Sequence, residues 1–424
     1  MSKAFLEDLE WRGLIAQSTD RKELETALAK PISLYLGVDP TAPSMHLGNL
    51  VVFLVLRRFQ LAGHRPIALV GGATGLVGDP SGKNDERTLN EEKLVADWVS
   101  KIRKQVEKIL DFKDKSVSAK LVNNLDWTKS VSALELLRDI GKHFSVNQML
   151  AKDSVATRLS STGISYTEFS YQVLQAYDYL ELYRRDQCKL QIGGSDQWGN
   201  IVAGLDLIRK VEGGSAYALT VPLLTKSDGS KFGKTASGAI WLDENMTSAY
   251  EFFQFWLNSD DADLPKLLKV FSMKDRAEIE RLIETVKVNP GAREAHRELA
   301  REMTALIHGQ QMAKSVEEAA KALFGQGEIA DLDLKTLDSA LSQLPKTTIK
   351  KGDPYPSWVD LLAATGVVDS KSAARRIVKE GGGYLNNKKV ESEDFTPSKN
   401  DLLHGKYLLL RKGKRDLAAV EVIG

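Results

Sequence analysis

Two side chains that can hold an oxygen-rich ligand, an imidazole and an amide, stand three residues apart at the start of a helix pattern. His46 and Asn49 follow the turn-rich segment 37–45 and open the apolar-periodic run 50–61. The first amide groups of a helix have no intrahelical partner and carry partial positive charge. The stretch therefore predicts a phosphate-binding site at a helix N-terminus.

A loop further along the chain offers two amines to the same kind of ligand. Residues 231–235 read Lys-Phe-Gly-Lys-Thr, which combines two lysines with a glycine and a hydroxyl. The loop does not match a P-loop, because three residues rather than four separate Gly229 from Gly233 and no long helix pattern follows. The loop is still a candidate for binding phosphate, by a geometry other than that of a P-loop.

A phenol, an amide and a carboxylate share one face of the helix that the periodicity predicts over residues 167–183. Tyr171, Gln175 and Asp178 fall at positions i, i+4 and i+7, beside an apolar stripe that faces a core. Such a row forms either the hydrogen-bonding wall of a pocket or a solvated helix face. The pattern alone leaves both interpretations open.

The elements that must position these groups alternate between strands and helices. Strand patterns that run into glycines occur at residues 32–36, 67–70 and 190–192. With helix patterns between them, they indicate a parallel α/β sheet whose ligands lie at the carboxyl ends of the strands. A dinucleotide-binding loop is disfavoured, because two residues rather than one separate Gly72 from Gly75.

The chain divides by composition into four regions. Residues 1–245 contain all the groups above, residues 246–330 have an almost wholly helical pattern, and residues 331–353 are predicted to be a linker. Residues 354–424 combine a short basic helix with a hairpin signal, and over residues 350–424 there are 14 basic and 10 acidic side chains. Such a unit is typical of RNA binding, although a small solvated tail domain would look similar.

The bulk composition indicates an ordinary protein without a strong charge preference. Its 424 residues include 58 basic and 57 acidic side chains, so a basic patch must be local. The single cysteine, Cys188, excludes an internal disulfide and fits a reducing cytoplasm. The charged N-terminal segment is unlike a signal peptide, and no window is apolar enough to span a membrane.

The two phosphate-binding stretches together resemble the paired signatures of class I aminoacyl-tRNA synthetases, His-x-Gly-His and Lys-Met-Ser-Lys-Ser. Further stretches, which extend the likeness over essentially the whole chain, narrow it to the tyrosyl-tRNA synthetases of the bacterial type: Gly37-Val-Asp-Pro-Thr, Val70-Gly-Gly-Ala-Thr-Gly, Gly78-Asp-Pro-Ser-Gly-Lys, Asp139-Ile-Gly-Lys-His-Phe-Ser-Val-Asn, Glu168-Phe-Ser-Tyr and Gln191-Ile-Gly-Gly-Ser-Asp-Gln-Trp-Gly-Asn. The resemblance implies an α/β protein with a Rossmann-like parallel-sheet catalytic domain, then an α-helical domain on the anticodon side, and a small α+β RNA-binding domain similar to a ribosomal protein.

The reaction implied by the resemblance has two steps. The carboxylate of L-tyrosine attacks the α-phosphate of ATP and pyrophosphate leaves; the tyrosyl group then passes to the 3′ end of tRNA(Tyr). A carboxylate is already nucleophilic at pH 7, so the first step needs positioning and stabilisation of phosphate charge rather than a general base. Mg²⁺ is expected to accompany ATP without a dedicated protein site. The family is homodimeric, and one tRNA contacts both subunits.

The resemblance also assigns roles to residues of this chain. The catalytic residues, most of which contact the phosphates, are His46, Asn49, Lys83, Arg87, Lys231, Lys234 and Thr235. The residues that bind ATP are Gly37, Asp39, His46, Gly48, Asn49, Gly193, Asp196 and Lys234. The residues that bind tyrosine are Tyr35, Asp79, Tyr171, Gln175, Asp178, Gln191 and Gln197. The residues that bind RNA are Arg375, Arg376, Lys379, Lys388, Lys389, Arg411, Lys412, Lys414 and Arg415.

Within the tyrosine set the resemblance separates three tasks. Tyr35 and Asp178 hold the phenolic hydroxyl, and Gln197 orients the carboxylate and the α-phosphate. The residues around the α-amino group are Asp79, Tyr171 and Gln175, with Gln191 nearby. A site of this kind rejects phenylalanine, because the polar groups that it buries then lack a partner.

This sequence departs from the family pattern at a few positions. Asn49 replaces the second histidine of the first signature, and its amide N–H can stand in for an imidazole N–H. Leu36 and Val52 are apolar where the family often has polar residues, and residues 232–233 read Phe-Gly in place of Met-Ser. We expect the contact of Asn49 to survive, and Leu36 and Val52 to alter nucleotide affinity and not the reaction.

Two other interpretations are weighed against a tyrosine-specific enzyme. A tryptophanyl-type synthetase shares the fold, but an indole has no hydroxyl for Asp178 and Tyr35 to hold. An RNA-binding relative without catalytic activity would have no need of His46, Lys231 and Lys234. Both interpretations are therefore disfavoured.

Overall fold

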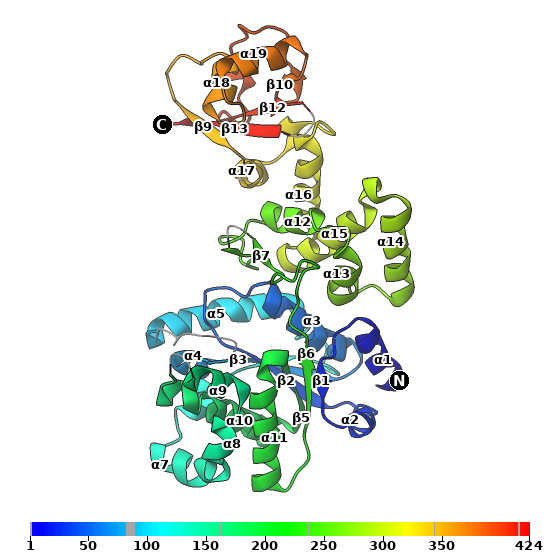
Figure 1. Cartoon of the computed structure of the whole chain (residues 1–424), viewed down its shortest axis with the longest axis vertical. Helices are drawn as coiled ribbons and strands as arrows, with labels where there is room; N and C mark the ends of the chain where they lie inside the picture. Colours follow the sequence, from blue (N-terminus) through cyan, green and yellow to red (C-terminus); the bar gives the residue numbers. More distant parts are fainter. Residues whose placement is uncertain (1, 82–89, 161–162, 236–237, 343, 414–415) are drawn as a thin grey trace. The chain divides into compact units, whose positions relative to one another are not determined.

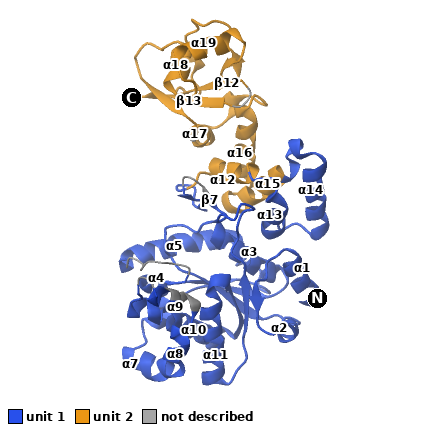
Figure 2. Ribbon diagram, in the orientation of Figure 1, with its two compact units in different colours: residues 1–246, 259–295 blue, residues 247–258, 296–424 orange. Residues whose placement is uncertain are grey.

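The computed structural model describes the whole chain except residues 1, 82–89, 161–162, 236–237, 343 and 414–415. Contacts between residues divide it into two compact units (Figure 2). Unit 1 comprises Met1–Met246 and Ser259–Ala295, and unit 2 comprises Thr247–Asn258 and His296–Gly424. No helix among the described residues is long and apolar enough to cross a membrane.

Unit 1 is built on a six-stranded sheet with the order β1-β6-β5-β2-β3-β4 (Figure 1). All neighbouring strands are parallel except β1, which pairs antiparallel with β6. The chain builds from β2 to β3 and β4 on one side, then returns to place β5 and β6 on the other. The strand order thus reverses between β2 and β5, which is where open α/β sheets bind their ligands. The strands are β1 (Gln17–Ser18), β2 (Ser33–Val38), β3 (Arg65–Val70), β4 (Lys120–Asn123), β5 (Cys188–Gly194) and β6 (Tyr217–Val221).

Helices cover both faces of this sheet, which confirms the predicted α/β class. Figure 1 shows α3 and α5 on one side and α8 to α11 on the other. The main helices are α1 (Ser2–Trp11), α2 (Arg21–Ala27), α3 (Leu47–Leu61), α4 (Thr74–Val77), α5 (Glu92–Ile109), α6 (Leu125–Thr128), α7 (Ala133–Glu135), α8 (Val146–Leu150), α9 (Asp153–Leu159), α10 (Tyr166–Asp186) and α11 (Trp198–Glu212). Short π- and 3₁₀-helical turns are η1 (Leu136–Ile140), η2 (Gly141–His143) and η3 (Ser195–Gln197).

Helix α10 spans the segment where the periodicity predicts a helix. Ser165 caps its N-terminus, where its hydroxyl accepts a hydrogen bond from the Glu168 amide at 3.3 Å. Gln187 caps its C-terminus in the left-handed conformation with φ of 50°. Its middle turns are buried between the sheet and α11, so polar residues there are withdrawn from water.

Two buried arginines attach a further pair of helices, α13 (Leu264–Phe271) and α14 (Arg276–Val288), to unit 1. Arg12 donates to the carbonyls of Lys269 and Ser272, and Arg58 donates to those of Val270 and Ser272, at 2.8–3.1 Å. These guanidinium groups satisfy carbonyls that the end of α13 leaves without helical partners. Because of this attachment, residues 259–295 group with the sheet, whereas composition places them in the helical region 246–330.

Unit 2 combines helices with a five-stranded sheet of order β11-β10-β12-β13-β9. The helices are α12 (Ala249–Leu257), α15 (Glu294–His308, which begins in unit 1), α16 (Gln310–Leu323), α17 (Leu334–Ser342), α18 (Trp358–Ala364) and α19 (Lys371–Lys379). The strands are β9 (Lys346–Lys350), β10 (Gly383–Leu385), β11 (Lys388–Lys389), β12 (Tyr407–Lys412) and β13 (Asp416–Ile423). Trp358 is fully buried at the centre of the core that α18 and α19 form with this sheet.

The segment 331–353, expected to be a linker, contains a helix and a strand instead. Strand β9 pairs in parallel with β13 at the far end of the chain, from Lys346 opposite Ala419 to Lys350 opposite Ile423. The expectation was wrong here because the five residues of β9 have no aromatic side chain and their pairing partner is remote in sequence. Polar contacts also join this region to the C-terminal sheet, since Tyr407 donates its hydroxyl to Asp338.

Candidate active site

The residues predicted to bind ATP and tyrosine gather at the carboxyl ends of β2 and β5, where the strand order reverses. Tyr35 lies directly opposite Gln191 in the parallel pairing of these strands. The chain that leaves β2 carries Asp39 and then His46, and the chain that leaves β5 enters the short turn η3 with Asp196 and Gln197. The structure therefore brings together side chains that the sequence spreads over three separate stretches.

The first signature forms a capping box at the start of α3. The Nδ1 atom of His46 accepts hydrogen bonds from the amides of Gly48 and Asn49, at 3.0 and 3.4 Å. In return, Asn49 accepts at Oδ1 from the His46 amide at 3.1 Å. Because Nδ1 and Oδ1 both act as acceptors, His46 carries its proton on Nε2 and Asn49 has its amide nitrogen as the remaining donor. Both signature side chains are thus presented as hydrogen-bond donors, which suits anionic or hydroxyl oxygens.

The second signature lies against the first. The amide of Leu47 donates to the Ile240 carbonyl at 3.2 Å, and the amide of Leu242 donates to the Met45 carbonyl at 2.9 Å. Gly233 has φ of +79°, and a Cβ built on it would lie 3.1 Å from Cβ of Leu47. The loop that contains the two lysines is therefore anchored beside the N-terminus of α3.

The lysines of this loop are exposed on a short hairpin. Lys231 forms an isolated bridge with Thr225, and Lys234 lies in β7 (Lys234–Thr235), which pairs with β8 (Gly238–Ala239). Two other predicted phosphate ligands, Lys83 and Arg87, fall outside the described residues, as does the side chain of Thr235. Their predicted roles remain predictions.

Asp178 of α10 is a buried carboxylate with two side-chain donors. Asn124 Nδ2 donates to its Oδ2 at 2.9 Å, and Trp127 Nε1 donates to its Oδ1 at 2.8 Å. Only 3% of Asp178 is exposed, and this burial raises its pKa to about 7, although the two hydrogen bonds act in the opposite direction. A carboxylate held in this way presents oriented lone pairs inside a low-dielectric pocket.

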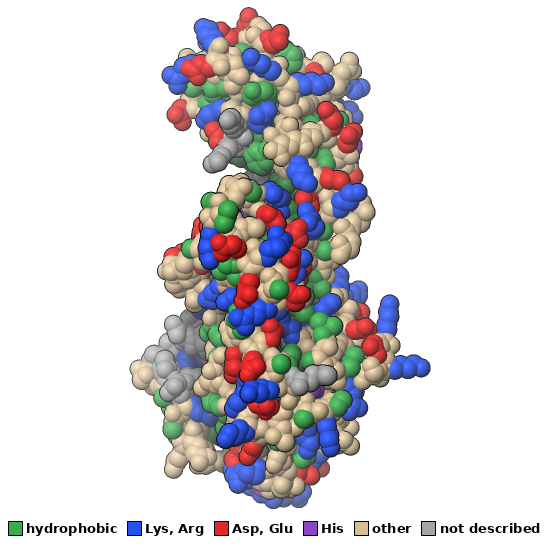
Figure 3. Space-filling model, turned by 90° about the vertical axis from the view of Figure 1, so that its right-hand side faces the viewer, with side chains coloured by type: hydrophobic (Ala, Val, Ile, Leu, Met, Phe, Trp, Pro, Cys, Tyr) green, Lys and Arg blue, Asp and Glu red, His purple; other side chains and the backbone are tan. Residues whose placement is uncertain are grey.

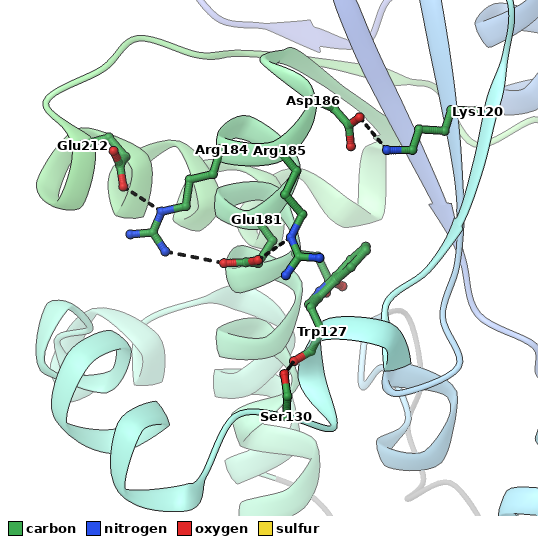
Figure 4. Close-up of polar contacts among 9 residues, drawn as sticks. Lys120, Trp127, Ser130, Glu181, Arg184, Arg185, Asp186 and Glu212 are labelled. Carbon is green, nitrogen blue, oxygen red and sulfur yellow. Dashed lines mark hydrogen bonds and ion pairs between the residues drawn. The ribbon is translucent and has the colours of Figure 1, made fainter.

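Helix α10 and the adjacent arginines fix Trp127 in place. The guanidinium carbon of Arg185 lies 5.5 Å from the centre of the Trp127 ring, and Arg185 pairs with Glu181 at 2.7 Å. Figure 4 shows Trp127 beside Arg185, and Ser130 donating to the Trp127 carbonyl. The indole N–H that holds Asp178 is therefore itself positioned by an ion pair.

The raised pKa of Asp178 predicts a pH-dependent contribution to stability. Because the folded state binds this proton more tightly than the unfolded state, the group lowers the free energy of unfolding progressively as pH rises from about 4 to about 7, by up to ~4 kcal/mol. We expect the melting temperature of Asp178→Asn, minus that of the unaltered protein, to increase with pH across this window. Thermal unfolding at pH 5, 6, 7 and 8 measures the difference, and a difference independent of pH would contradict the assignment.

Three buried polar atoms close to Asp178 have no hydrogen-bond partner among the described residues. They are Tyr35 Oη, Gln175 Oε1 and Gln191 Oε1. A hydrogen-bonding group that is buried without a partner costs about 1–3 kcal/mol, so native proteins seldom leave one unused. All three belong to the predicted tyrosine-binding set, and their position predicts a polar ligand that supplies the missing partners.

A second hydrogen-bonded chain lies beside this pocket. Tyr171 donates its hydroxyl to Asp39 at 2.7 Å, and Thr74 donates to the other oxygen of Asp39 at 2.6 Å. Gly71 makes room for this contact, since a Cβ there would lie 2.1 Å from Oδ1 of Asp39. Tyr171 is 6% exposed and Asp178 is 3% exposed, so the polar row on helix 167–183 is withdrawn from water and is not a solvated helix face.

Polar residues that the sequence analysis does not single out complete the site. Asn124 uses its amide nitrogen to donate to Thr74 as well as to Asp178, and its oxygen accepts from the Ala73 amide. It is fully buried just after β4, at the same sheet edge as the other site residues. A polar residue at the carboxyl end of a parallel strand is the signal that could have identified it.

The remaining positions predicted to lie near the nucleotide are on β2, β5 and α3. Gly193 is buried in β5, and a Cβ there would lie 2.9 Å from Ile201 of α11. Leu36 is buried in β2 and Val52 is half-buried in α3. Gly37, at the end of β2, has only one atom within 4 Å of its Cβ position.

The predicted RNA-binding residues lie on α19 and on the strands of the C-terminal sheet. The strand register places Lys389 and Arg411 on either side of Tyr384, and the Arg411 guanidinium carbon lies 3.9 Å from the centre of its ring. Arg375, Arg376 and Lys379 are on α19, Lys388 is on β11, Lys412 is on β12, and Lys414 and Arg415 lie outside the described residues.

Acidic neighbours offset part of this positive charge. Lys379 pairs with Glu393 at 3.2 Å and Lys412 pairs with Asp416 at 3.1 Å. Exposed pairs of this kind contribute little to stability and exchange readily for other partners. Figure 3 shows the same interspersion of basic and acidic side chains over the visible face.

Comparison with known proteins matches the chain to two described families. The family described as "tRNA synthetases class I (W and Y)" matches residues 27–325, and the family "Tyrosine--tRNA ligase SYY-like C-terminal domain" matches residues 336–420. Relatives named "Tyrosine--tRNA ligase" include those of Streptomyces coelicolor, 57% identical over 99% of both chains, and Corynebacterium glutamicum, 52% identical over 99% of both chains.

Solved structures give the same grouping. A C-terminally truncated mitochondrial tyrosyl-tRNA synthetase of Aspergillus nidulans is 33% identical with a TM-score of 0.69, over 76% of this chain and 94% of that chain. A tryptophanyl-tRNA synthetase of Encephalitozoon cuniculi, over 74% of this chain and 91% of that chain, reaches a TM-score of 0.54 at 16% identity, which shows a shared fold and no more. The chain therefore belongs to the tyrosine–tRNA ligases among the class I aminoacyl-tRNA synthetases.

Proposed function

We propose that this enzyme activates L-tyrosine in the pocket between β2, β5 and α10, with ATP at the N-terminus of α3. The observation that carries the proposal is the group of buried, unpartnered atoms of Tyr35, Gln175 and Gln191 around the buried carboxylate of Asp178. Tyrosine supplies a hydroxyl for Asp178 and Tyr35 at one end of the pocket. At the other end, its α-amino group fits the acceptors near Tyr171.

In the first step the tyrosine carboxylate attacks the α-phosphate of ATP, a bond forms from carboxylate oxygen to phosphorus, and pyrophosphate leaves. Gln197 is placed to orient the carboxylate and the α-phosphate. His46 and the two lysines of the 231–235 loop donate hydrogen bonds to phosphate oxygens that gain negative charge, and Asn49 donates a hydrogen bond to the nucleotide ribose. Donors fixed in this way stabilise the transition state more than the ground state.

Mg²⁺ is the expected companion of ATP. Among the described residues, no group of three or more His, Cys, Asp or Glu side chains is placed to hold a metal ion. We therefore propose that phosphate oxygens and water supply most of its ligands, as is usual for nucleotide-bound Mg²⁺. No step of the mechanism here depends on a protein-bound metal.

The second step transfers the tyrosyl group to the 3′ end of tRNA(Tyr). We propose residues 1–245 as the catalytic domain, the helical region to residue 330 as the anticodon-side domain, and the C-terminal sheet with α18 and α19 as an RNA-binding domain. The basic residues of α19 and of β11 and β12 are placed to contact tRNA phosphates. A reducing cytoplasm is the proposed location, consistent with the buried thiol of Cys188.

Amino-acid-dependent exchange of pyrophosphate into ATP tests this function. Tyrosine should support exchange, and tryptophan and phenylalanine should support far less. Exchange that is faster with tryptophan would reassign the pocket to the tryptophanyl-type enzyme. Absence of exchange with any amino acid would favour the RNA-binding relative without catalytic activity.

The space beside the His46 ring depends on Gly48. A Cβ built on Gly48 would lie 2.8 Å from Cε1 and 3.0 Å from Nδ1 of His46. We expect Gly48→Ala to displace the imidazole and to lower kcat for pyrophosphate exchange by about 10- to 100-fold, with the Kd for tyrosine unchanged. Gly291→Ala, where the Cβ would lie in ordinary contact at 3.9 Å from Asn289 Oδ1, controls for loss of a glycine; an equal loss in the control would contradict the prediction.

We also propose that the protein is a homodimer through the surface around α7 to α10. Leu134, Leu137, Val146 and Tyr166 are large apolar side chains that are 58–79% exposed there, and such groups of apolar side chains mark interaction sites. We expect Tyr166→Asp to convert the dimer to a monomer in analytical ultracentrifugation. Leu61→Asp, at an equally exposed leucine on α3, should leave the mass unchanged; a monomeric unaltered protein would refute the proposal.

A further inference from the structure

The amide of Gln197 contacts carboxylates through its nitrogen and another amide through its oxygen, and its nitrogen lies 3.5 Å from Asp196 Oδ2. The Nε2 atom of Gln197 donates to Asp79 Oδ2 at 2.7 Å, and its Oε1 accepts from Asn200 Nδ2 at 3.3 Å. Asn200 is 9% exposed and lies in the first turn of α11, three residues after Gln197. This spacing places the two side chains next to one another on consecutive turns.

The direction of these hydrogen bonds follows from chemistry. A carboxylate accepts and does not donate, so the nitrogen of the Gln197 amide faces Asp79 and its oxygen faces away. That oxygen then requires a donor, which Asn200 supplies. The same Asn200 nitrogen lies 3.4 Å from the hydroxyl oxygen of Ser81, which can accept a hydrogen bond from it.

The orientation of the Gln197 amide decides what the substrates meet. The tyrosine carboxylate and the α-phosphate both present oxygens that accept hydrogen bonds. If the amide were rotated by half a turn, its oxygen would face the substrate oxygens and Asp79, and repulsion between oxygens would replace the hydrogen bonds. The residues that fix the rotation therefore control whether Gln197 assists the reaction.

We infer that Asn200 is a positioning residue that, together with Asp79, holds the amide orientation of Gln197, so that an N–H and not an oxygen is presented to the tyrosine carboxylate and the α-phosphate. The inference rests on the proposed function, because it takes Gln197 to contact those groups. Asn200 itself contacts no reacting atom; it acts through Gln197.

The substitution Asn200→Asp tests this with a side chain of the same shape. At pH 8 the introduced carboxylate accepts only, so it draws the Gln197 nitrogen toward itself and turns the oxygen to the substrates. We expect kcat for tyrosine-dependent pyrophosphate exchange to fall by about 10²-fold. Asn200→Ala removes the donor to the Gln197 oxygen while Asp79 still accepts from the Gln197 nitrogen, so it should cost about tenfold or less.

A pH profile separates orientation from packing. When the introduced carboxyl is protonated it donates again, so the ratio of Asn200→Asp to unaltered activity should rise as pH falls from 8 to 6. The other charged groups described around Gln197 and α11 are Asp79, Asp196 and Lys152, whose amine donates to the Gly199 carbonyl. These groups are present in both proteins, so the effect of their own titration cancels in the ratio of the two activities.

A double-mutant cycle separates orientation from simple charge repulsion. In a Gln197→Ala background there is no amide to turn, so adding Asn200→Asp should cost less than about threefold more. An equal cost in both backgrounds would overturn the inference in favour of repulsion. A loss with Asn200→Ala as large as with Asn200→Asp, together with a lower melting temperature, would overturn it in favour of a packing role.

The unaltered protein distinguishes failure of the inference from failure of the proposed function. If it shows tyrosine-dependent exchange while Asn200→Asp is fully active at every pH, the inference alone is wrong. If it shows no exchange with tyrosine, the proposed function is wrong.

Discussion

Asp178→Ala is expected to lower kcat/KM for tyrosine in pyrophosphate exchange by about 10²-fold or more, and to leave the KM for ATP within about threefold. The substrate hydroxyl loses a hydrogen bond to a carboxylate, which contributes about 1.5–3 kcal/mol. In addition, Asn124 and Trp127 lose the acceptor at 2.8–2.9 Å that they hold in the folded protein. The change acts at the end of the pocket remote from the α-phosphate.

The ratio of activity with tyrosine to activity with phenylalanine is the sharper measurement. In the unaltered protein a bound phenylalanine leaves Asp178 and Tyr35 without the hydroxyl, so the ratio is large. We expect Asp178→Ala to reduce the ratio, because tyrosine loses its advantage while phenylalanine loses little. An equal loss of affinity for tyrosine and ATP would show that the pocket is misplaced.

Lys234→Ala is expected to lower the rate of tyrosyl-adenylate formation by about 10²- to 10³-fold with little change in the Kd for tyrosine. Lys234 stands on the exposed hairpin beside the α3 N-terminus, where it can meet the phosphates that gain charge as pyrophosphate departs. A contact that strengthens only in the transition state changes kcat and not substrate affinity.

Rapid-mixing measurement of adenylate formation separates the two quantities for this variant. Lys226→Ala provides the control, since Lys226 lies in the same loop and its amide donates to the Ser230 carbonyl on the way into the hairpin. We expect the control to keep its rate within about threefold. A weakened Kd for tyrosine with an unchanged rate would mean that Lys234 acts in the amino-acid pocket instead.

Local chemistry explains which parts of the site are predictable from sequence. His46 and Asn49 stand where a strand pattern meets a helix pattern, and the structure places them in a capping box at that helix start. The row of Tyr171, Gln175 and Asp178 follows from helical spacing alone. In both examples the residues that form the group lie within two turns of one helix, so local spacing is enough to predict that they share a face.

Other parts depend on partners that are remote in the sequence. Whether the row on α10 faces water or is buried depends on Asn124 and Trp127, which come from the residue just after β4 and from α6. The strand β9 was missed for the same reason, because its ladder is formed with β13. No sequence pattern marks Asn200 as important. Its inferred role depends on the direction of its hydrogen bond to Gln197, which the contact between Gln197 and Asp79 fixes.

The capping box at α3 limits which amino acids can occupy position 49. The side chain there must accept a hydrogen bond from the His46 amide through an atom close to its own backbone, and must carry a donor beyond that atom. Asparagine and histidine both satisfy the two demands, with Oδ1 and Nδ2 in one and Nδ1 and Nε2 in the other. Aspartate satisfies only the first demand, and alanine satisfies neither. Asparagine in place of histidine at position 49 is therefore one of the few substitutions that keep both the helix cap and the hydrogen-bond donor predicted to face the substrate.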